Sequence, residues 1–321
     1  MKDIDDSVLT NLWRCMARIR LFEERVHEEV AADRLEGYVH TYAGEEAVAA
    51  GVIPLLRDND WLTSTYRNHG HAIARGVPLS AIAGELCGKA TGVCGGKGGS
   101  MHVADQDLGM IGAMGIVAGG LPIATGAAFA ARYRGEDRVA VAFFGDGAVH
   151  QGTFHEAMMF ASLFTCPVLF VCENNLYAET TAVDYHLVAG SVTAMAEPYR
   201  VEAHEVDGMD VFAVRAAAGE AIDRARRTGR PQLLEAMTYR YYGQYEGDTQ
   251  TYKPPDEVAR YRARDPLDQF RARVGAEGGM SVEALDRIEV EIRDEVDAAF
   301  VSAAAAPWPD LAMVTADVYT T

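Results

Sequence analysis

Residues 139–175, VAVAFFGDGAVHQGTFHEAMMFASLFTCPVLFVCENN, constrain the fold more than any other part of the chain. They begin with an unbroken apolar run at 139–144, which is typical of a strand buried on both faces of a parallel sheet. Residues 152–164 have helical spacing, and a second apolar run follows at 166–172. The segment therefore predicts a β–α–β unit with two parallel strands. The apolar face of its helix is expected to consist of Phe154, Ala157, Met158, Ala161 and Leu163.

Polar residues follow each of the two predicted strands, and the carboxyl ends of parallel strands meet at the edge where ligands of open α/β sheets bind. Asp146 offers a carboxylate oxygen and Asn175 an amide oxygen, which suit Mg²⁺ or Ca²⁺. Gly147 permits close approach of the backbone, and the free N–H groups of the following helix favour an anion. These features predict a site for a diphosphate bridged to the protein by a divalent ion. A turn and a loop that bind nothing are the alternative.

The rest of the chain predicts further elements of the same sheet. We expect one α/β domain over residues 1–321, built on a doubly wound, mostly parallel sheet flanked by helices. A long amphipathic helix is expected at 7–32, and a C-terminal helical extension at about 256–305 is followed by a mostly extended tail. The remaining predicted elements are helices at 122–132 and 211–227, strands at 200–206 and 232–241, and a loop at 242–253.

Charge and composition exclude several classes of protein. The chain carries 47 acidic and 29 basic residues, and its net charge of −18 argues against nucleic acid as a partner. No apolar run approaches the length of a membrane span, and the acidic start of the chain is unlike a signal peptide, so we expect a cytoplasmic protein. The five cysteines are widely spaced and mostly in apolar segments, which predicts buried thiols in a reducing compartment.

Residues 63–71, TSTYRNHGH, concentrate polar, aromatic and basic side chains. Arg67 could pair with a phosphate, Tyr66 could donate a hydrogen bond, and His69 could move a proton near neutral pH. The alternative is a cluster of structural histidines whose hydrogen bonds are satisfied. The glycine-rich stretches 88–99 and 109–120 lack the spacing of nucleotide-binding motifs, so we do not predict a nucleotide site there.

Gly-Asp-Gly followed after 26 residues by Asn-Asn resembles the thiamine diphosphate signature of transketolase-type and 2-oxo acid dehydrogenase enzymes. The motifs YRNHGH, GKGGSMH, GIVAGGLPIATGAA, GDGAVHQGTFHEAMMFA, ENN and VDGMD occur in the order of that second family. From about Arg20 to the tail the chain is similar to the α subunits of the decarboxylating component of pyruvate, branched-chain and acetoin dehydrogenase complexes. The resemblance implies a thiamine-diphosphate-binding fold, with thiamine diphosphate and Mg²⁺ as cofactors.

The resemblance also implies roles for individual residues. Asp146, Asn175 and the backbone carbonyl of Tyr177 would hold Mg²⁺, and His69 would be an active-site histidine. Val117 would meet the cofactor near its aminopyrimidine. The residues implied to contact the cofactor are Tyr66, Arg67, Gly115, Val117, Gly145, Asp146, Gly147, Ala148, Asn175 and Tyr177.

The reaction implied is cleavage of a carbon–carbon bond next to the carbonyl of acetoin or of a 2-oxo acid such as pyruvate, with transfer of the fragment to a lipoyl acceptor on an acyltransferase partner. The α subunits of the family lack the glutamate that protonates the aminopyrimidine, which a β subunit supplies in an assembly of two α and two β chains. The loop Tyr245–Tyr252 resembles the EGD-x-Q-x-Y stretch of acetoin dehydrogenase α subunits, so acetoin is the favoured substrate.

Gln244 departs from the family pattern at a predicted catalytic position. Most members carry a histidine there, which lies near the diphosphate and helps to pass the acyl group to lipoamide. Glutamine can hydrogen-bond a phosphate but cannot donate a proton near pH 7. Two alternatives therefore stand beside the main prediction: a two-component thiamine-diphosphate-dependent decarboxylase or carboligase without lipoyl transfer, and a non-catalytic paralogue that stabilises a partner chain.

Overall fold

A six-stranded sheet with the strand order β2-β1-β3-β4-β8-β7 forms the centre of the structure. The structure is a computed structural model and describes residues 4–277 and 279–316. Every pair of neighbouring strands in this sheet is parallel, which confirms the predicted doubly wound fold. The strands are β1 (Trp61–Thr65), β2 (Met110–Met114), β3 (Ala140–Gly145), β4 (Val168–Asn174), β7 (Glu202–Asp207) and β8 (Gln232–Met237).

The predicted β–α–β unit is present, with one change at its centre. Strand β3 and strand β4 end side by side, with Gly145 paired to Glu173. Between β3 and helix α6 (Gly152–Leu163) lies a 3₁₀ turn, η2 (Asp146–His150), so the first N–H groups after β3 belong to this turn and not to the helix. The prediction that Leu163 belongs to the buried apolar face of this helix was wrong, because the residue is 69% exposed.

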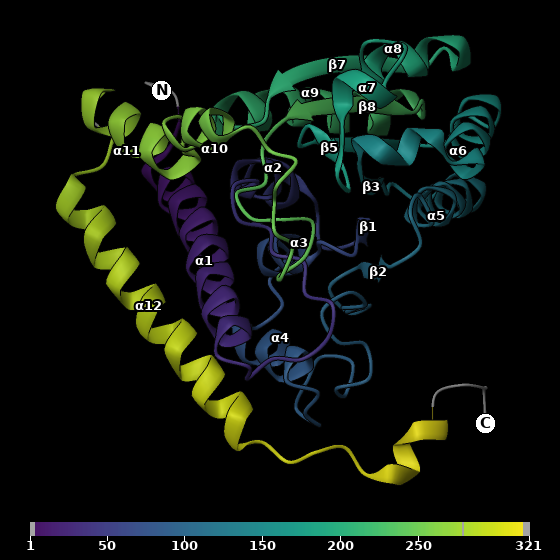
Figure 1. The fold of residues 1–321 in the computed structure, drawn as a ribbon. Coiled ribbons are helices and arrows are strands. Elements are labelled where there is room, and N and C mark those ends of the chain that lie inside the picture. The colour runs from purple at the N-terminus through teal and green to yellow at the C-terminus, as the bar shows by residue number, and fades with distance from the viewer. Residues whose placement is uncertain (1–3, 278, 317–321) are drawn as a thin grey trace.

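Helices cover both faces of the sheet, and alternate residues of β3 and β4 belong to different cores. Val141, Phe143 and Val171 pack against the side of α1 and α12, whereas Phe144 and Phe170 pack against the side of α5 and α6 (Figure 1). The longer helices are α1 (Asp6–Ala31), α4 (Leu79–Leu86), α5 (Gly120–Arg134), α9 (Val211–Thr228), α10 (Pro255–Arg262), α11 (Pro266–Glu277) and α12 (Val282–Ala305). The shorter helices are α2 (Glu46–Val52), α3 (His69–Arg75), α7 (Val183–His186) and α8 (Val192–Ala196), and a small hairpin pairs β5 (Tyr177–Ala178) with β6 (Thr181–Ala182).

The first and last long helices lie side by side, α1 in purple and α12 in yellow in Figure 1. Trp13 of α1 is fully buried, and its indole N–H donates to the carbonyl of Leu285 at 3.1 Å. The tail after α12 was predicted to be mostly extended, but it contains a 3₁₀ turn, η4 (Leu311–Thr315). Residues 317–321 of that tail lie outside the described residues. Across the part of the chain that the structure describes, no helix combines the length and the apolar character needed to cross a membrane.

All five cysteines are free thiols. Cys166 and Cys172 are buried, as the sequence predicted, whereas Cys15, Cys87 and Cys94 are partly exposed. The prediction of buried thiols was therefore wrong for three of the five.

The glycine-rich segment 88–99 folds around the carboxylate of Glu85, a fully buried residue of α4. Both carboxylate oxygens accept hydrogen bonds from backbone N–H groups of the segment. The donors are Cys94 at 2.7 Å and Gly96 at 2.9 Å to Oε2, and Gly98 at 2.7 Å and Gly99 at 3.1 Å to Oε1. The carboxylate of Glu85, which α4 supplies, thus determines the path of the glycine-rich backbone around it, because this backbone has few side chains that could pack.

Candidate active site

A cavity of about 510 Å³ lies at the carboxyl ends of β1, β3 and β4. Its walls are formed by parts of five segments, 38–45, 64–67, 114–120, 143–151 and 173–179, and by Met101, Arg240 and Gln244. The edge of the sheet that the sequence singled out therefore carries a pocket of the size that binds small molecules and cofactors.

Nine of the ten residues predicted to contact the cofactor line this cavity. They are Tyr66, Arg67, Gly115, Val117, Gly145, Gly147, Ala148, Asn175 and Tyr177. The tenth, Asp146, lies between two lining residues with its side chain buried. The structure thus brings the predicted residues together, and their individual roles stay predictions.

The carboxylate of Asp146 is held by a histidine that the sequence analysis did not identify. His186 of α7 has its Nε2 2.9 Å from Oδ2 of Asp146, and its Nδ1 lies 3.0 Å from Nε2 of His150. A neutral His186 that donates to Asp146 would accept a hydrogen bond from His150, so this pair fixes the orientation of the carboxylate. No motif marks His186, because it follows Asp146 by 40 residues across another strand and a hairpin.

The predicted metal ligands Asn175 and Tyr177 are joined through the side chain of the first. The N–H of Tyr177 donates to Oδ1 of Asn175 at 3.4 Å, and Nδ2 of Asn175 donates to Oε1 of Glu45 at 3.0 Å. The carbonyl of Tyr177 accepts from Nη1 of Arg240 at 3.1 Å. These contacts orient the amide of Asn175 at the end of β4.

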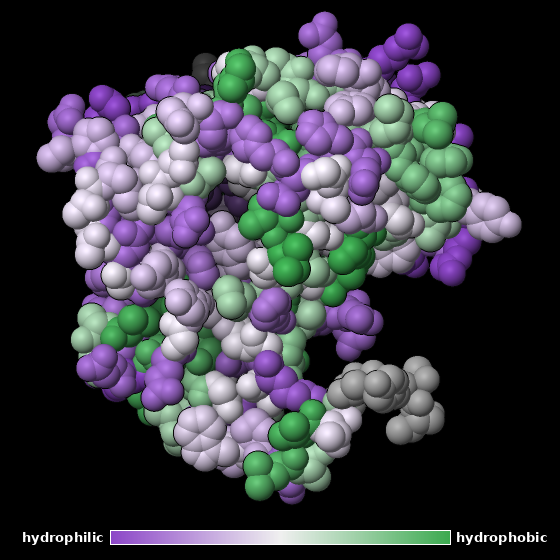
Figure 2. All heavy atoms as spheres, turned by 45° about the vertical axis from the view of Figure 1, so that its right-hand side comes forward, coloured by the Kyte–Doolittle hydropathy of each residue, from purple (hydrophilic) through white to green (hydrophobic). Residues whose placement is uncertain are grey.

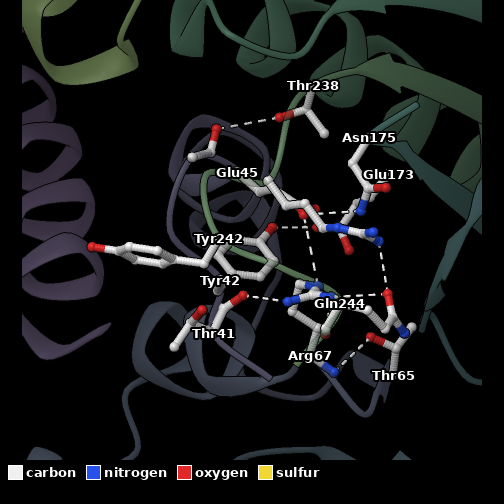
Figure 3. A network of polar contacts seen from close by, with 12 residues as sticks. Thr41, Tyr42, Glu45, Thr65, Arg67, Glu173, Asn175, Thr238, Tyr242 and Gln244 are labelled. Carbon is white, nitrogen blue, oxygen red and sulfur yellow. Dashed lines mark hydrogen bonds and ion pairs between the residues drawn. The ribbon is translucent and has the colours of Figure 1, made fainter. Parts of the chain in front are cut away.

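Arg67 and Gln244 lie next to each other in the wall of the cavity (Figure 3). The guanidinium of Arg67 is buried and donates to the carbonyls of Thr41 and Gln244, the second at 2.9 Å. Nε2 of Gln244 donates to the hydroxyl of Tyr66 at 2.9 Å, and its Oε1 accepts from Nη1 of Arg240 at 2.7 Å. Gln244 therefore joins the two arginines and the tyrosine that give this wall its hydrogen-bond donors.

Two carboxyl groups also line the cavity, those of Glu45 and Glu173. Glu173 accepts from the hydroxyl of Tyr42 and lies 2.9 Å from Nε2 of His71. Burial, and then the charge of Glu173, raise the pKa of Glu45 to about 8, against the opposing effect of Arg67. The cavity thus combines buried carboxyl groups, of which that of Glu45 is mostly protonated near pH 7, with the buried guanidinium groups of Arg67 and Arg240, a setting that suits an anion.

His69 does not line the cavity. It is fully buried, with Nδ1 3.1 Å from both carboxylate oxygens of Glu23 and Nε2 3.0 Å from the hydroxyl of Ser100. These contacts satisfy both ring nitrogens, as the structural alternative requires. His69 does not reach the cavity directly, and its catalytic role stays a prediction.

His40 is the imidazole that the cavity wall presents. It is buried, its ring centroid lies 4.6 Å from that of Tyr66, and its Nδ1 has no hydrogen-bond partner among the described residues. Burial, and then the charges of Arg67 and His69, lower the pKa of His40 to about 3, so the ring is neutral near pH 7. The sequence analysis passed over His40, since the stretch around it matches no motif and has no clear period.

Acid should destabilise the protein through His40. The unfolded chain binds a proton on this histidine near pH 6.5, whereas the folded pKa is about 3. Between these values the unfolded state binds more protons, so the free energy of unfolding falls as the pH falls, by up to about 2 kcal/mol between pH 7 and pH 5. Replacing His40 by glutamine removes this contribution. Urea unfolding at both pH values should show a smaller loss for His40→Gln than for the wild type, and equal losses would contradict a neutral His40.

The chain belongs to the dehydrogenase E1 component family, whose model matches residues 14–312. It is 46% identical over 309 residues to the α subunit of the acetoin:2,6-dichlorophenolindophenol oxidoreductase of Bacillus subtilis, covering 96% of this chain and 92% of the relative. The protein of the same name from Cupriavidus necator is 45% identical over 317 residues, covering 98% and 95%. The pyruvate dehydrogenase E1 component α subunit of Rhizobium meliloti is 38% identical over 307 residues, covering 95% and 88%. Enzymes of this family depend on thiamine diphosphate.

Proposed function

We propose that this chain is the α subunit of a dehydrogenase that depends on thiamine diphosphate and Mg²⁺ and cleaves a carbon–carbon bond next to a carbonyl. The proposal includes transfer of the fragment to a lipoyl acceptor. The observation that carries it is the cavity at the ends of β1, β3 and β4, where nine predicted cofactor contacts converge in a member of a thiamine-diphosphate-dependent family. The names of the relatives support acetoin as the substrate, with pyruvate second.

The residues of the cavity fit the cofactor. Three buried polar atoms of its wall lack a partner within the described residues: Nδ1 of His40, Oε2 of Glu45 and Nε of Arg240. The backbone at Gly147 also leaves no room for a side chain, because a Cβ there would lie 2.6 Å from Cβ of Ala178. A ligand that brings both an anion and a divalent cation would satisfy groups of both kinds.

The proposed roles follow from these positions. Asp146, Asn175 and the carbonyl of Tyr177 would hold Mg²⁺, with His186 keeping the Asp146 carboxylate oriented. The diphosphate would be bound by Tyr66, Arg67 and Gln244 and by the N–H groups of Gly147 and Ala148. When bound, thiamine diphosphate supplies the nucleophilic carbon and the electron sink that cleavage beside a carbonyl requires.

A β subunit would complete the site in an assembly of two α and two β chains, and it would supply the glutamate for the aminopyrimidine. In support, Ile116 and Val117 on the cavity wall are 78% and 42% exposed. Figure 2 shows apolar groups in green on the side of the molecule that α5 and α6 occupy. The exposed apolar residues of α6 and its end are Met159, Phe160, Leu163 and Phe164. A surface of this kind is typical of a permanent protein interface.

Dye-linked oxidation tests the proposal. The purified chain would be mixed with its candidate β subunit, thiamine diphosphate and Mg²⁺, and the dye reduction compared for acetoin, pyruvate and branched 2-oxo acids. Reduction with one substrate would establish the enzyme class and select the substrate. If the cofactor binds but no substrate reduces the dye, the dehydrogenase assignment fails.

Gln244 favours a second candidate, a decarboxylase or carboligase that releases its product without a lipoyl partner. The side chain occupies the position of the usual proton donor, yet its amide cannot donate a proton near pH 7. Product analysis without any electron acceptor distinguishes this candidate, since it predicts turnover under those conditions.

Replacing Gln244 by histidine should raise lipoamide-dependent turnover. An imidazole beside Tyr66 would supply a proton donor for acyl transfer, and general acid catalysis of this kind contributes about 100-fold or more, so a gain of at least about tenfold is expected. The measurement is the single-turnover rate of transfer to lipoamide, with Gln244→Asn as the matched variant that adds no proton donor. No gain in that rate for Gln244→His would refute the interpretation of Gln244.

A further inference from the structure

The loop 242–253 carries the EGD-x-Q-x-Y residues that suggested acetoin as the substrate, yet most of these residues lie away from the cavity. Among the described residues of this loop, Gln244 alone lines the cavity. In Figure 1 the light-green chain that follows β8 passes in front of α2 and α3. The side chain of Glu246 is 6% exposed, although the residues on either side of it, Tyr245 and Gly247, are exposed. A buried carboxylate at such a place requires compensating partners.

Glu246 is fastened to the body of the protein at three points. Its Oε2 lies 2.6 Å from Nδ1 of His27 on α1, and its Oε1 accepts from the hydroxyl of Thr41 at 2.9 Å. Its backbone N–H donates to the carbonyl of Val39 at 2.8 Å. The ring of His27 also stacks on Tyr242, with centroids 4.3 Å apart and an angle of 9° between the rings. Together these contacts tie the start of the loop to α1 and to residues 39–41.

Glu246 is also connected to two residues of the cavity wall, Arg67 and Gln244, through hydrogen bonds. The carbonyl of Thr41, whose hydroxyl binds Glu246, accepts a hydrogen bond from Arg67. Arg67 in turn donates to the carbonyl of Gln244 at 2.9 Å. Glu246, Thr41, Arg67 and Gln244 thus form a closed circuit, because Gln244 and Glu246 belong to one short stretch of backbone. A change at Glu246 would alter the positions of the two residues that face the proposed diphosphate.

Asp248, the second carboxylate of the motif, makes its hydrogen bonds within the loop. Asp248 accepts from the N–H groups of Gln244 and Gln250, at 2.7 and 2.9 Å, and from the hydroxyl of Tyr252 at 2.7 Å. These partners all belong to the loop itself. Asp248 therefore shapes the loop internally, whereas Glu246 attaches the shaped loop to the protein.

We propose that Glu246 is a positioning residue that holds loop 242–253 closed against α1 and residues 39–41, so that Gln244 and Arg67 are held in place for the cofactor. The proposal rests on the proposed function for the identity of that cofactor. The motif EGD-x-Q-x-Y then acts on cofactor affinity through the conformation of the loop, and it does not contact the substrate. Neither Glu246 nor His27 is itself a catalytic residue.

The closure of the loop can be tested on the chain alone. Chymotrypsin should cleave after Tyr242 at least about fivefold faster in Glu246→Ala than in the wild type, because the ring of Tyr242 is stacked on His27 while the loop is closed. Glu246→Gln keeps an acceptor for Thr41 and should give an intermediate rate. Thr249→Ala is the matched control, an exposed residue of the same loop with no side-chain hydrogen bond in the described structure. An unchanged cleavage rate in Glu246→Ala would overturn the proposal whatever cofactor the protein uses.

The effect on the cofactor site needs the enzyme reconstituted with its β subunit. The KM for thiamine diphosphate should rise at least about tenfold in Glu246→Ala, with kcat at saturating cofactor within about twofold of the wild type and Thr249→Ala unchanged. A general loss of stability would lower the amount of active enzyme and leave the KM in place, so the split between KM and kcat identifies positioning. Faster cleavage with an unchanged KM would overturn the role of Glu246 while leaving the proposed function intact. A wild-type enzyme without any need for thiamine diphosphate would instead overturn the proposed function.

Discussion

Replacing Asp146 by alanine should abolish Mg²⁺-dependent binding of thiamine diphosphate. Asp146 is the one anionic side chain among the three proposed metal ligands, and Mg²⁺ depends strongly on carboxylate oxygens. We expect the affinity for the cofactor at saturating Mg²⁺ to fall by at least about 100-fold, which corresponds to about 2.7 kcal/mol. Isothermal titration calorimetry of the enzyme with its β subunit measures this loss directly.

The control for this experiment is Asp184→Ala. Asp184 is a carboxylate of α7, the helix that carries His186, but it is exposed. Its removal changes the net charge by the same amount near the same place and should leave the affinity within about twofold. Thermal unfolding of both variants would show that they fold. If Asp146→Ala binds the cofactor as tightly as the wild type, the metal assignment is wrong.

The largest effect on folding is expected from Gly44→Ala. Gly44 has a φ of +102°, and a Cβ there would lie 2.2 Å from the carbonyl oxygen of Tyr239. The left-handed conformation costs alanine about 1 to 2 kcal/mol, and the overlap with a backbone atom adds a larger cost, because the backbone cannot turn aside as a flexible side chain can. A loss above about 4 kcal/mol is expected, which would lower the Tm by at least about 6 °C.

Gly76→Ala separates the cost of the left-handed backbone conformation from the cost of the overlap with Tyr239. Gly76 has nearly the same φ, +101°, but no described atom lies within 4 Å of the position its Cβ would take. This variant carries the conformational cost alone, so its Tm should fall by a few degrees. Equal Tm values for the two variants, measured by circular dichroism, would show that the contact with Tyr239 relaxes at little cost.

The sequence predicted the centre of the sheet because β3 and β4 are apolar on both faces. It did not predict β1, since Thr63 and Ser64 interrupt the apolar pattern. Both are fully buried in the structure, where the hydroxyl of Thr63 donates to the carbonyl of Gly120 at 3.0 Å and that of Ser64 lies 2.7 Å from Nδ1 of His71. Polar residues can occupy a buried strand when tertiary partners satisfy them, and those partners are not visible in the local pattern.

The residues of the candidate site could also be predicted from the sequence only in part. Residues within the GDG and NN motifs were found because they follow two adjacent predicted strands, whereas Tyr66 and Arg67 were found because polar, aromatic and basic residues concentrate at 63–71 and because the family resemblance implies their roles. His40, Glu45, Arg240 and His186 were missed, since each reaches the site from another segment and matches no motif. His69 lies in a motif but belongs to α3, whose geometry directs it toward Glu23 and away from the cavity. Motif membership therefore identified the neighbourhood of the site more reliably than the direction of each side chain.

Glu85 explains why a segment as rich in glycine as 88–99 need not be a phosphate-binding loop. Four of its backbone N–H groups converge on a single acceptor, as they do around bound anions in other proteins. Here the acceptor is covalently part of the same chain and is held in place by α4, so it occupies these donors without the entropy cost of binding a separate molecule. A side chain of the neighbouring helix α4 thus takes up the donors of the segment, and a free phosphate group would have to displace it in order to bind there.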